Sequence, residues 1–325
     1  MGLFVFMAAV AILTLSFSYY CFRICFYSQG ESGSVEDHIP SGAQYESVRE
    51  RMLTVAKRME EAPCEHITIS GYKCGKLHGR YYAVDANAPI MLIFHGYRGV
   101  TFRDCAGGFA LGKKLGFNIL AVDQRCHGES NGHVITFGIR ERYDCQRWAE
   151  YAAKRFPRCP IILSGVSMGA ATVLMASELA LPAQVACIMA DCPYTAPMDI
   201  IGKVADDMGY PGFLSRPLIW LGGLIYGRFN VCSASALSAI KNAKIPILLI
   251  HGEDDLFVPC NMSRALKDAG GENAALHTFP QAGHGLSYLV DPHRYEQICI
   301  EFLNSIPVLR DHMENCEYVR NHFSA

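Results

Sequence analysis

The sequence predicts an α/β protein with a mostly parallel central sheet and helices on both faces. Two observations support this prediction. Short apolar runs typical of fully buried parallel strands recur along the chain and alternate with helical segments. The chain also has 325 residues, 50% of them hydrophobic, which suffices to bury the core of one large domain. Right-handed crossovers between such strands would place helices on both faces of the sheet.

The N-terminal stretch of the chain differs from the rest in composition. Residues 1–22 carry no charged side chain, and their apolar stretch of about 20 residues is long enough to span a bilayer. A cleavable signal peptide is the alternative, but the stretch lacks a charged n-region and an A-x-A-like site. Tyr19, Tyr20 and Phe22 precede Arg23 and resemble an interfacial belt with a cationic stop. The sequence therefore favours an uncleaved single-pass anchor at 1–28.

Two features bear on which side of the membrane carries the rest of the chain. Arg23 favours a cytoplasmic domain, whereas the free α-amino group favours the opposite orientation. The 14 cysteines have no paired spacings, and Cys187 and Cys299 lie in apolar segments, as suits a reducing compartment. We therefore expect the cytoplasmic face.

A linker and a helix are expected at 29–64, before the sheet begins. Residues 28–34 are typical of a flexible connector, and the apolar spacing of 45–59 predicts a helix. An antiparallel hairpin and the parallel strands should follow, at 66–70, 76–84, 89–94, 117–122, 160–164, 186–190, 245–250 and 275–280.

The pentapeptide G-x-S-x-G at 165–169 joins a predicted strand to a predicted helix. This is the setting that a serine nucleophile requires, because the turn is so sharp that its flanking positions must be small. A chance match is the alternative in a chain with 29 glycines. Ser167 is the candidate nucleophile.

The partners that a serine needs follow later in the chain. Asp254 and Asp255 follow three residues after the buried strand at 245–250, at the sheet edge where Ser167 is expected. His284 lies in a glycine-flanked turn after the last strand and is the candidate general base. Along the chain, the candidate serine is thus followed by an acid and then by a histidine.

Five blocks together resemble a known family, and the resemblance covers roughly residues 65 to 306. The blocks are HGYRG at 95–99, DQRCHGES at 123–130, GVSMG at 165–169, HGEDDLFVP at 251–259 and Gly283-His284. They are similar to the α/β-hydrolase superfamily, in its esterase, lipase and peptidase-like branch. The resemblance implies an α/β-hydrolase fold over 65–310, followed by a C-terminal tail at 311–325. It also implies that Asp255, at the fifth position of its block, is the acid, with Asp254 as the alternative.

Each group then has an expected role in acyl transfer. His284 would take the proton of Ser167 and return it to the leaving group, and Asp255 would orient the imidazole. The backbone N–H of Met168, at the helix start, would donate to the oxyanion. By the resemblance, the N–H of Tyr97 would be the second donor.

About fifty residues separate the strand at 186–190 from the one at 245–250, too many for a plain crossover. They predict a helical cap insertion at about 194–243. Its apolar segment would place Trp220, Leu221 and Ile225 against the substrate, and ordinary core packing is the alternative for these three. Asp199, Asp206 and Asp207 of the cap would be able to hold a substrate amine.

The formal net charge of −2 and the dispersed basic residues give no case for a nucleic-acid partner. No His, Cys and Asp grouping has metal-ligand spacing, so no metal and no cofactor are expected. The expected partners are a small-molecule ester, possibly lipid-like, and the membrane.

The function expected from the sequence is cleavage of a carboxylic ester through an acyl-enzyme. A serine peptidase, an aminopeptidase-like enzyme and a thioesterase share the same triad and are the alternatives. A catalytically silent membrane-tethered binding protein is the alternative from another class.

Overall fold

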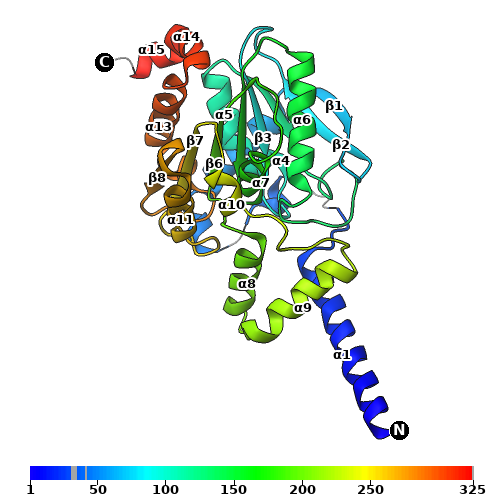
Figure 1. The fold of residues 1–325 in the computed structure, drawn as a ribbon. Helices are drawn as coiled ribbons and strands as arrows, with labels where there is room; N and C mark the ends of the chain where they lie inside the picture. Colours follow the sequence, from blue (N-terminus) through cyan, green and yellow to red (C-terminus); the bar gives the residue numbers. More distant parts are fainter. Residues whose placement is uncertain (31–34, 41, 324–325) are drawn as a thin grey trace.

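The computed structural model describes residues 1–30, 35–40 and 42–323, and the chain folds around one eight-stranded sheet (Figure 1). Its strands are β1 (Glu65–Ser70), β2 (Lys76–Tyr82), β3 (Ile90–Phe94), β4 (Asn118–Val122), β5 (Ile161–Val166), β6 (Val185–Asp191), β7 (Ile247–Gly252) and β8 (Ala274–Phe279). The strand order is β1-β2-β4-β3-β5-β6-β7-β8. The β1–β2 and β2–β4 pairs are antiparallel, and all the other pairs are parallel.

The mostly parallel sheet and all eight predicted strands are confirmed, with ends shifted by at most two residues. The central strands β3, β4 and β7 are buried at every position, which is why each appears in the sequence as an unbroken apolar run. Their side chains alternate between two cores. Ile90, Leu92 and Phe94 face one core, and Met91 and Ile93 face the other.

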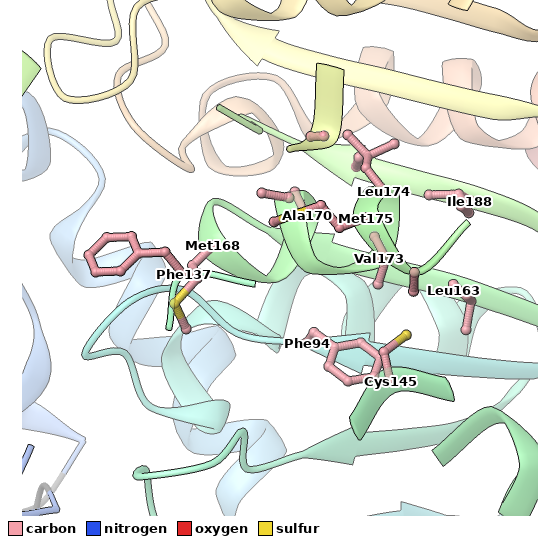
Figure 2. Close-up of a cluster of buried hydrophobic side chains, with 14 of the residues drawn as sticks. Phe94, Phe137, Cys145, Leu163, Met168, Ala170, Val173, Leu174, Met175 and Ile188 are labelled. Atoms are coloured by element: carbon pink, nitrogen blue, oxygen red, sulfur yellow. The ribbon is translucent and has the colours of Figure 1, made fainter. Parts of the chain in front are cut away.

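Helices cover both faces of the sheet, as predicted. The first core, part of which is shown around α7 in Figure 2, includes side chains of α6 (Glu141–Arg155), α7 (Met168–Ala176), α10 (Ala236–Lys241) and α11 (Asn261–Gly270). The second core includes side chains of α3 (Arg49–Glu60), α5 (Ala106–Lys114), α13 (Pro292–Asn304) and α14 (Pro307–Asn315).

The helical insertion between β6 and β7 is confirmed, and it comprises α8 (Pro197–Asp207), α9 (Gly212–Ile225) and α10. α9 packs alongside α1 (Gly2–Cys25) (Figure 1). Gly222 allows this close approach, because a Cβ there would collide with the carbonyl oxygen of Ser18. The hydroxyl of Tyr226 donates to the carbonyl oxygen of Leu15 at 3.1 Å.

Among the described residues, α1 is the one helix that is long and apolar enough to cross a membrane, with a mean hydropathy of 2.0. Its last turn and the residues after it belong to the folded domain. Phe22 and Phe26 are buried in the first core. Residues 26–28 pair with 133–135, with N–H to O distances of 2.8 Å from Ile135 to Phe26 and 3.0 Å from Ser28 to His133.

The region before the sheet is packed against the domain rather than separate from it. The helix predicted at 45–59 is confirmed as α3, although it begins at Arg49 because residues 47–48 form a turn after the short helix α2 (Ala43–Glu46). Met52, Ala56 and Met59 of α3 are buried in the second core. The guanidinium of Arg103 donates to the carbonyl oxygen of His38 at 2.7 Å. Of the predicted flexible connector, residues 31–34 lie outside the described part of the chain. The shorter helices are α2 (Ala43–Glu46), α4 (Thr101–Asp104), α12 (Ser287–Val290) and α15 (Glu317–Phe323), the last lying in the expected C-terminal tail.

Candidate active site

The turn between β5 and α7 places Ser167 at its tip. Ser167 has φ 55° and ψ −115°, a backbone conformation that is strained for a residue with a side chain. The two flanking glycines are required sterically: a Cβ on Gly165 would collide with the backbone of Gly169, and one on Gly169 would collide with the carbonyl oxygen of Phe94. The hydroxyl is thus held above the amino end of α7, beyond the carboxyl edge of the sheet.

Two hydrogen bonds join Ser167, His284 and Asp255 in a row. Oγ of Ser167 lies 3.0 Å from Nε2 of His284, and Nδ1 of His284 lies 2.7 Å from Oδ2 of Asp255. The carboxylate only accepts, so Nδ1 carries the proton and Nε2 is left to accept the serine hydroxyl. The structure therefore brings together the three side chains that the sequence selected.

Asp255 is held as an ionised acceptor. Its Oδ1 accepts from the backbone N–H groups of Phe257 and Val258, at 2.9 and 2.8 Å. Burial raises its pKa, but hydrogen bonds from His251 and His284 outweigh burial and bring the pKa well below its ordinary value. The competing acid, Asp254, is exposed, and its backbone N–H donates to Ala282 in the turn. Of the two acids, Asp255 is the one that contacts His284.

The two predicted oxyanion donors, Met168 and Tyr97, both lie near Ser167. Met168 is the first residue of α7, so its N–H is among those that a helix cannot satisfy internally. Tyr97 lines the same cavity as Ser167, and the loop that carries it is fixed by Gly96, whose N–H donates to Oδ2 of Asp104 at 2.9 Å. Burial opposes ionisation of Asp104, but Arg103 and His95 lower its pKa overall.

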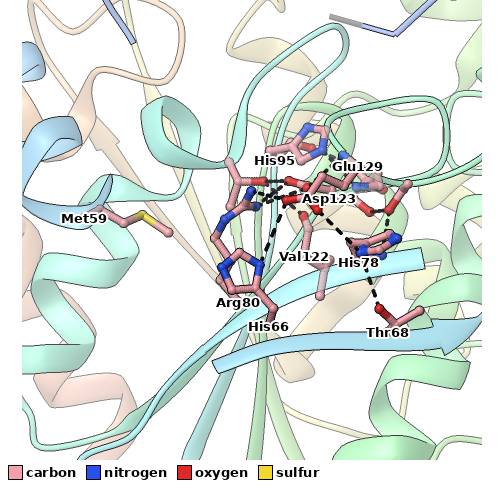
Figure 3. Close-up of polar contacts among 12 residues, drawn as sticks. Met59, His66, Thr68, His78, Arg80, His95, Val122, Asp123 and Glu129 are labelled. Atoms are coloured by element: carbon pink, nitrogen blue, oxygen red, sulfur yellow. Dashed lines mark hydrogen bonds and ion pairs between the residues drawn. The ribbon is translucent and has the colours of Figure 1, made fainter. Parts of the chain in front are cut away.

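The loop that carries Tyr97 is anchored by a polar network around β4 (Figure 3). Arg80 donates to both carboxylate oxygens of Asp123 at 3.1 Å and to Glu129 at 3.1 Å. This fixes the turn after β4, where the N–H of Gln124 donates to Nε2 of His95 at 2.9 Å. His95 is fully buried and serves this loop, since Ser167 contacts His284 instead.

A cavity of about 230 Å³ lies beside Ser167 and His284. Its walls come from the loop at 96–97, from α5 and α12, and from the region at 40–55 that precedes the sheet. Most of the lining side chains from that region and from the C-terminal part of the domain are apolar or aromatic: Pro40, Tyr45, Met52, Val55, Phe257, Leu286, Tyr288, Leu289 and Tyr295.

Asp191 is a lining residue that the sequence reasoning missed. It ends β6, and its carbonyl oxygen accepts the N–H of Ser167 at 2.8 Å. Burial raises the pKa of its carboxyl to about 6, partly opposed by His251 and Tyr295. Within the described part of the chain, its buried Oδ1 has no hydrogen-bond partner. An acid directly after a buried strand, at the edge that carries Ser167, was the available signal.

The cap residues expected at the substrate lie elsewhere. Among the described residues, those that line the cavity do not include Trp220, Leu221 or Ile225, which lie on α9 where that helix packs against α1. The physical reason is that α9 buries its small-residue face on α1 instead of folding over Ser167. The three acids of α8 are also engaged away from the cavity, Asp199 with Thr195, Asp206 with Arg216 and Asp207 with Lys203.

One group at the site has the geometry of potential metal ligands. Ligand atoms of Cys192, Asp255 and His284 lie within 4.8 Å of one another. Nδ1 of His284 is already hydrogen-bonded to Asp255, and burial raises the pKa of the Cys192 thiol well above its ordinary value. The site as built favours the hydrogen-bonded triad over metal ligation, because ligation needs a free ring nitrogen and a thiolate.

With this fold and site established, the class of protein follows. Residues 91–298 match the model of the alpha/beta hydrolase family, and the chain belongs to that family. It is 25% identical over 194 residues to the uncharacterized protein YqkD of Bacillus subtilis. That match covers 59% of this chain and 64% of the relative, so the chain matches less than two thirds of its relative's length.

Solved structures share the fold. An esterase of Pyrococcus furiosus, Pf2001, superposes with a TM-score of 0.61 at 22% identity, over 77% of this chain and 95% of the esterase. A puromycin-hydrolyzing peptidase of Mycobacterium tuberculosis gives a TM-score of 0.57 at 17% identity, over 75% of this chain and 39% of the peptidase. An acylaminoacyl peptidase of Pyrococcus horikoshii gives 0.55 at 19% identity, over 77% and 42% of the two chains. At these identities the likeness concerns the fold.

Proposed function

We propose that this chain is a serine hydrolase that cleaves a carboxylic ester through an acyl-enzyme, with Ser167 as the nucleophile, His284 as the general base and Asp255 as the acid. The observation that carries the proposal is the pair of consecutive hydrogen bonds from Ser167 to His284 and from His284 to Asp255. Membership of the alpha/beta hydrolase family and the esterase fold neighbour agree with it.

The proton path follows from these contacts. As Oγ of Ser167 bonds to the ester carbonyl carbon, its proton passes to Nε2 of His284, and Asp255 stabilises the imidazolium. The bond to the leaving alkoxide then breaks, and His284 returns the proton to that oxygen. Water repeats the sequence: it gives a proton to His284, bonds to the acyl carbon, and releases the acid as Oγ recovers its proton.

The carbonyl oxygen gains negative charge in each addition step. In this proposal the N–H groups of Met168 and Tyr97 donate to it, and one such donor contributes about 3 kcal/mol of barrier lowering. Met168 adds the positive end of the α7 dipole to its hydrogen bond.

The substrate that we propose is an ester with an apolar acyl group. The cavity beside Ser167 is lined by Met52, Val55, Leu286 and Leu289 among its apolar side chains. An apolar wall favours an apolar chain because each buried methylene contributes about 0.8 kcal/mol. In this proposal the region before the sheet and α12 bind the acyl group, in place of the cap.

We further propose that α1 is an uncleaved membrane anchor. Cleavage at the end of α1, after Cys25, would remove Phe22 from the core and would leave Phe26 and the paired residues 26–28 at a new chain end. A removable signal peptide is not expected to be built into the domain that it delivers. All 14 cysteines lie among the described residues and are free thiols, which favours the cytoplasmic face.

Peptide hydrolysis is the second candidate, and one observation favours it. Asp191 lines the cavity and its buried Oδ1 has no partner within the described chain, so in this candidate function that oxygen accepts a hydrogen bond from a substrate amine. Two of the fold neighbours are peptidases.

A panel of p-nitrophenyl acyl esters and aminoacyl-p-nitroanilides separates the two activities. The ester proposal expects turnover of the esters that rises with acyl length until the cavity is full, and loss of that turnover in Ser167→Ala. Turnover of the anilides alone, lost in Ser167→Ala and weakened in Asp191→Asn, would replace it with the peptidase. A well-folded protein that turns over neither class would contradict both.

A further inference from the structure

We infer that α9, together with the turn that joins it to α8, lies in the surface of the bilayer that holds α1, so that the cavity beside Ser167 opens next to the membrane. The inference rests on the proposed anchoring by α1 and adds a second membrane contact. It assigns a bilayer-resident ester, drawn from the lipid layer, as the substrate class.

α9 contacts α1 along the apolar part of that helix. Gly222 lies against Ser18 and Phe22, and Tyr226 donates to the carbonyl oxygen of Leu15. These contacts fall within the uncharged part of α1, before Arg23. α9 is therefore beside the apolar stretch of the anchor and not beyond its cationic end.

The apolar stretch of α1 matches the thickness of the bilayer. The uncharged apolar stretch of α1 at 3–22 is about 30 Å long at 1.5 Å per residue, which equals the thickness of a bilayer hydrocarbon core. Immersion of that stretch reaches the level of Ser18 and Phe22. Because α9 lies at the same level, it meets the lipid wherever α1 is fully inserted.

The surface that would enter the lipid carries many exposed apolar side chains. Phe213 is 78% exposed, although exposed phenylalanines are costly in water. The other exposed apolar side chains of α9 and of the turn before it are Met208, Tyr210, Leu214, Trp220, Leu224 and Ile225. They lie on or next to the helix that packs against α1, most of whose side chains are also exposed and apolar.

Two pairs of opposite charges lie near this surface. Arg216, the one charged residue of α9, contacts Asp206 of α8 at 2.7 Å. Lys203 contacts Asp207 at 2.5 Å. Paired charges at the level of the lipid head groups cost less than isolated ones, so they do not oppose the seating of α9.

α8 lies between this surface and the site. α8 begins six residues after β6 ends, and thus leaves the sheet at the carboxyl edge that carries Ser167. Lys203 of α8 also donates to the carbonyl oxygen of Leu256, next to Asp255. Leu256 is exposed, and Phe257 lines the cavity with its ring 5.1 Å from that of His284. α8 and the loop at 256–257 therefore connect the α8–α9 turn to the triad.

The two tryptophans provide a direct test with the full-length protein in phosphatidylcholine vesicles. Trp220 is 39% exposed on α9, whereas Trp148 is 1% exposed in the core. Vesicles whose acyl chains carry bromine quench only tryptophans that contact lipid. The emission due to Trp220 is the difference between the wild type and Trp220→Phe. The Trp220 emission should be at least about twofold lower in brominated vesicles than in unbrominated ones, because an interfacial helix buries its apolar face about 5–10 Å deep.

A third variant separates this inference from the proposed anchoring. Phe6→Trp in the Trp220→Phe background reports the insertion of α1. Quenching at position 6 without quenching of Trp220 would overturn the seating of α9 and leave the anchor intact. An absence of quenching at both positions would overturn the anchor and, with it, this inference.

A second experiment tests delivery of the substrate. Phe213→Glu combined with Leu214→Glu places charges at exposed positions outside the cavity. Hydrolysis of an ester embedded in vesicles should fall about tenfold, because charges resist entry into lipid, whereas hydrolysis of soluble p-nitrophenyl acetate should stay within about twofold. Val308→Glu, at an exposed apolar site on α14, is the matched control and should change neither rate. Equal rates of hydrolysis of the vesicle-embedded ester by the double variant and the wild type would overturn the inference that the substrate reaches the cavity from the bilayer.

Discussion

Nε2 of His251 lies 3.3 Å from Oδ2 of Asp255, the same oxygen that accepts the hydrogen bond from Nδ1 of His284. Nε2 of His251 also lies 2.8 Å from the carbonyl oxygen of Val258, which only accepts, so this nitrogen carries the proton. The hydroxyl of Ser263 donates to Nδ1 at 2.6 Å. His251 is therefore a fully buried histidine that positions the acid.

This contact predicts a kinetic effect for His251→Phe. The loss of a donor to a charged group costs about 1.5–3 kcal/mol, so kcat should fall about tenfold or more while KM stays within about twofold. His251→Gln, which keeps an N–H donor, should recover part of the loss. Steady-state kinetics on a soluble ester measure both, with the exposed His293→Gln as the control. A His251→Phe enzyme with full kcat would show that Asp255 needs no support from this side.

The nucleophile turn predicts a steric effect. Gly169→Ala should destabilise the fold by about 3 kcal/mol or more, because the new Cβ meets the backbone of Phe94, which cannot move aside. Gly108→Ala is the matched control on α5, where the Cβ meets only the end of the Ile93 side chain at 3.0 Å. It should change the stability by no more than about 1 kcal/mol. Urea unfolding of both variants measures the difference, and equal midpoints would argue against the tight turn.

Asp191 predicts a pH dependence of stability. Its pKa is raised from 3.8 to about 6 by burial, so the folded state binds the proton more tightly than the unfolded state. The wild type should therefore lose stability relative to Asp191→Asn as the pH rises through this interval. The loss should be on the order of 3 kcal/mol by pH about 7. Urea unfolding of the two proteins across this interval measures it, and a difference that does not change with pH would contradict the buried carboxyl.

The junction between α1 and the domain predicts contrasting effects for two phenylalanines. Phe26→Ala should destabilise the detergent-solubilised protein by about 3–5 kcal/mol, because Phe26 is fully buried with its ring against Phe137 and Phe229. Phe6→Ala, on the exposed part of α1, should leave the unfolding of the domain unchanged. Denaturant unfolding compares the two. Equal effects would mean that the end of α1 is not part of the core.

Much of the fold and of the triad was predictable because the signals are local. A buried parallel strand such as β3 appears as an apolar run, and the turn at Ser167 requires its own flanking glycines. The order of Asp255 and His284 after Ser167 follows from the order of the strands that carry them.

The walls of the cavity were not predictable in the same way. Met52 and Val55 reach the site because α3 packs on α4 and α5, a contact between segments with no shared motif. The length and the apolar segment of the insertion suggested a cap over the substrate. The contact of Gly222 with Ser18 that holds α9 against α1 instead depends on a close approach of two helices that are distant in the sequence. Asp191 was missed because one acid at a strand end is uninformative until its burial is known.

The most direct test of the account is covalent labelling by a fluorophosphonate probe. The two neighbouring acids provide the matched pair, since Asp255 contacts His284 and Asp254 is exposed. We expect the wild type to label, Ser167→Ala to lose labelling entirely, His284→Ala and Asp255→Asn to label far more slowly, and Asp254→Asn to label like the wild type. Well-folded wild-type protein that does not label, or labelling that survives Ser167→Ala, would contradict the proposed nucleophile.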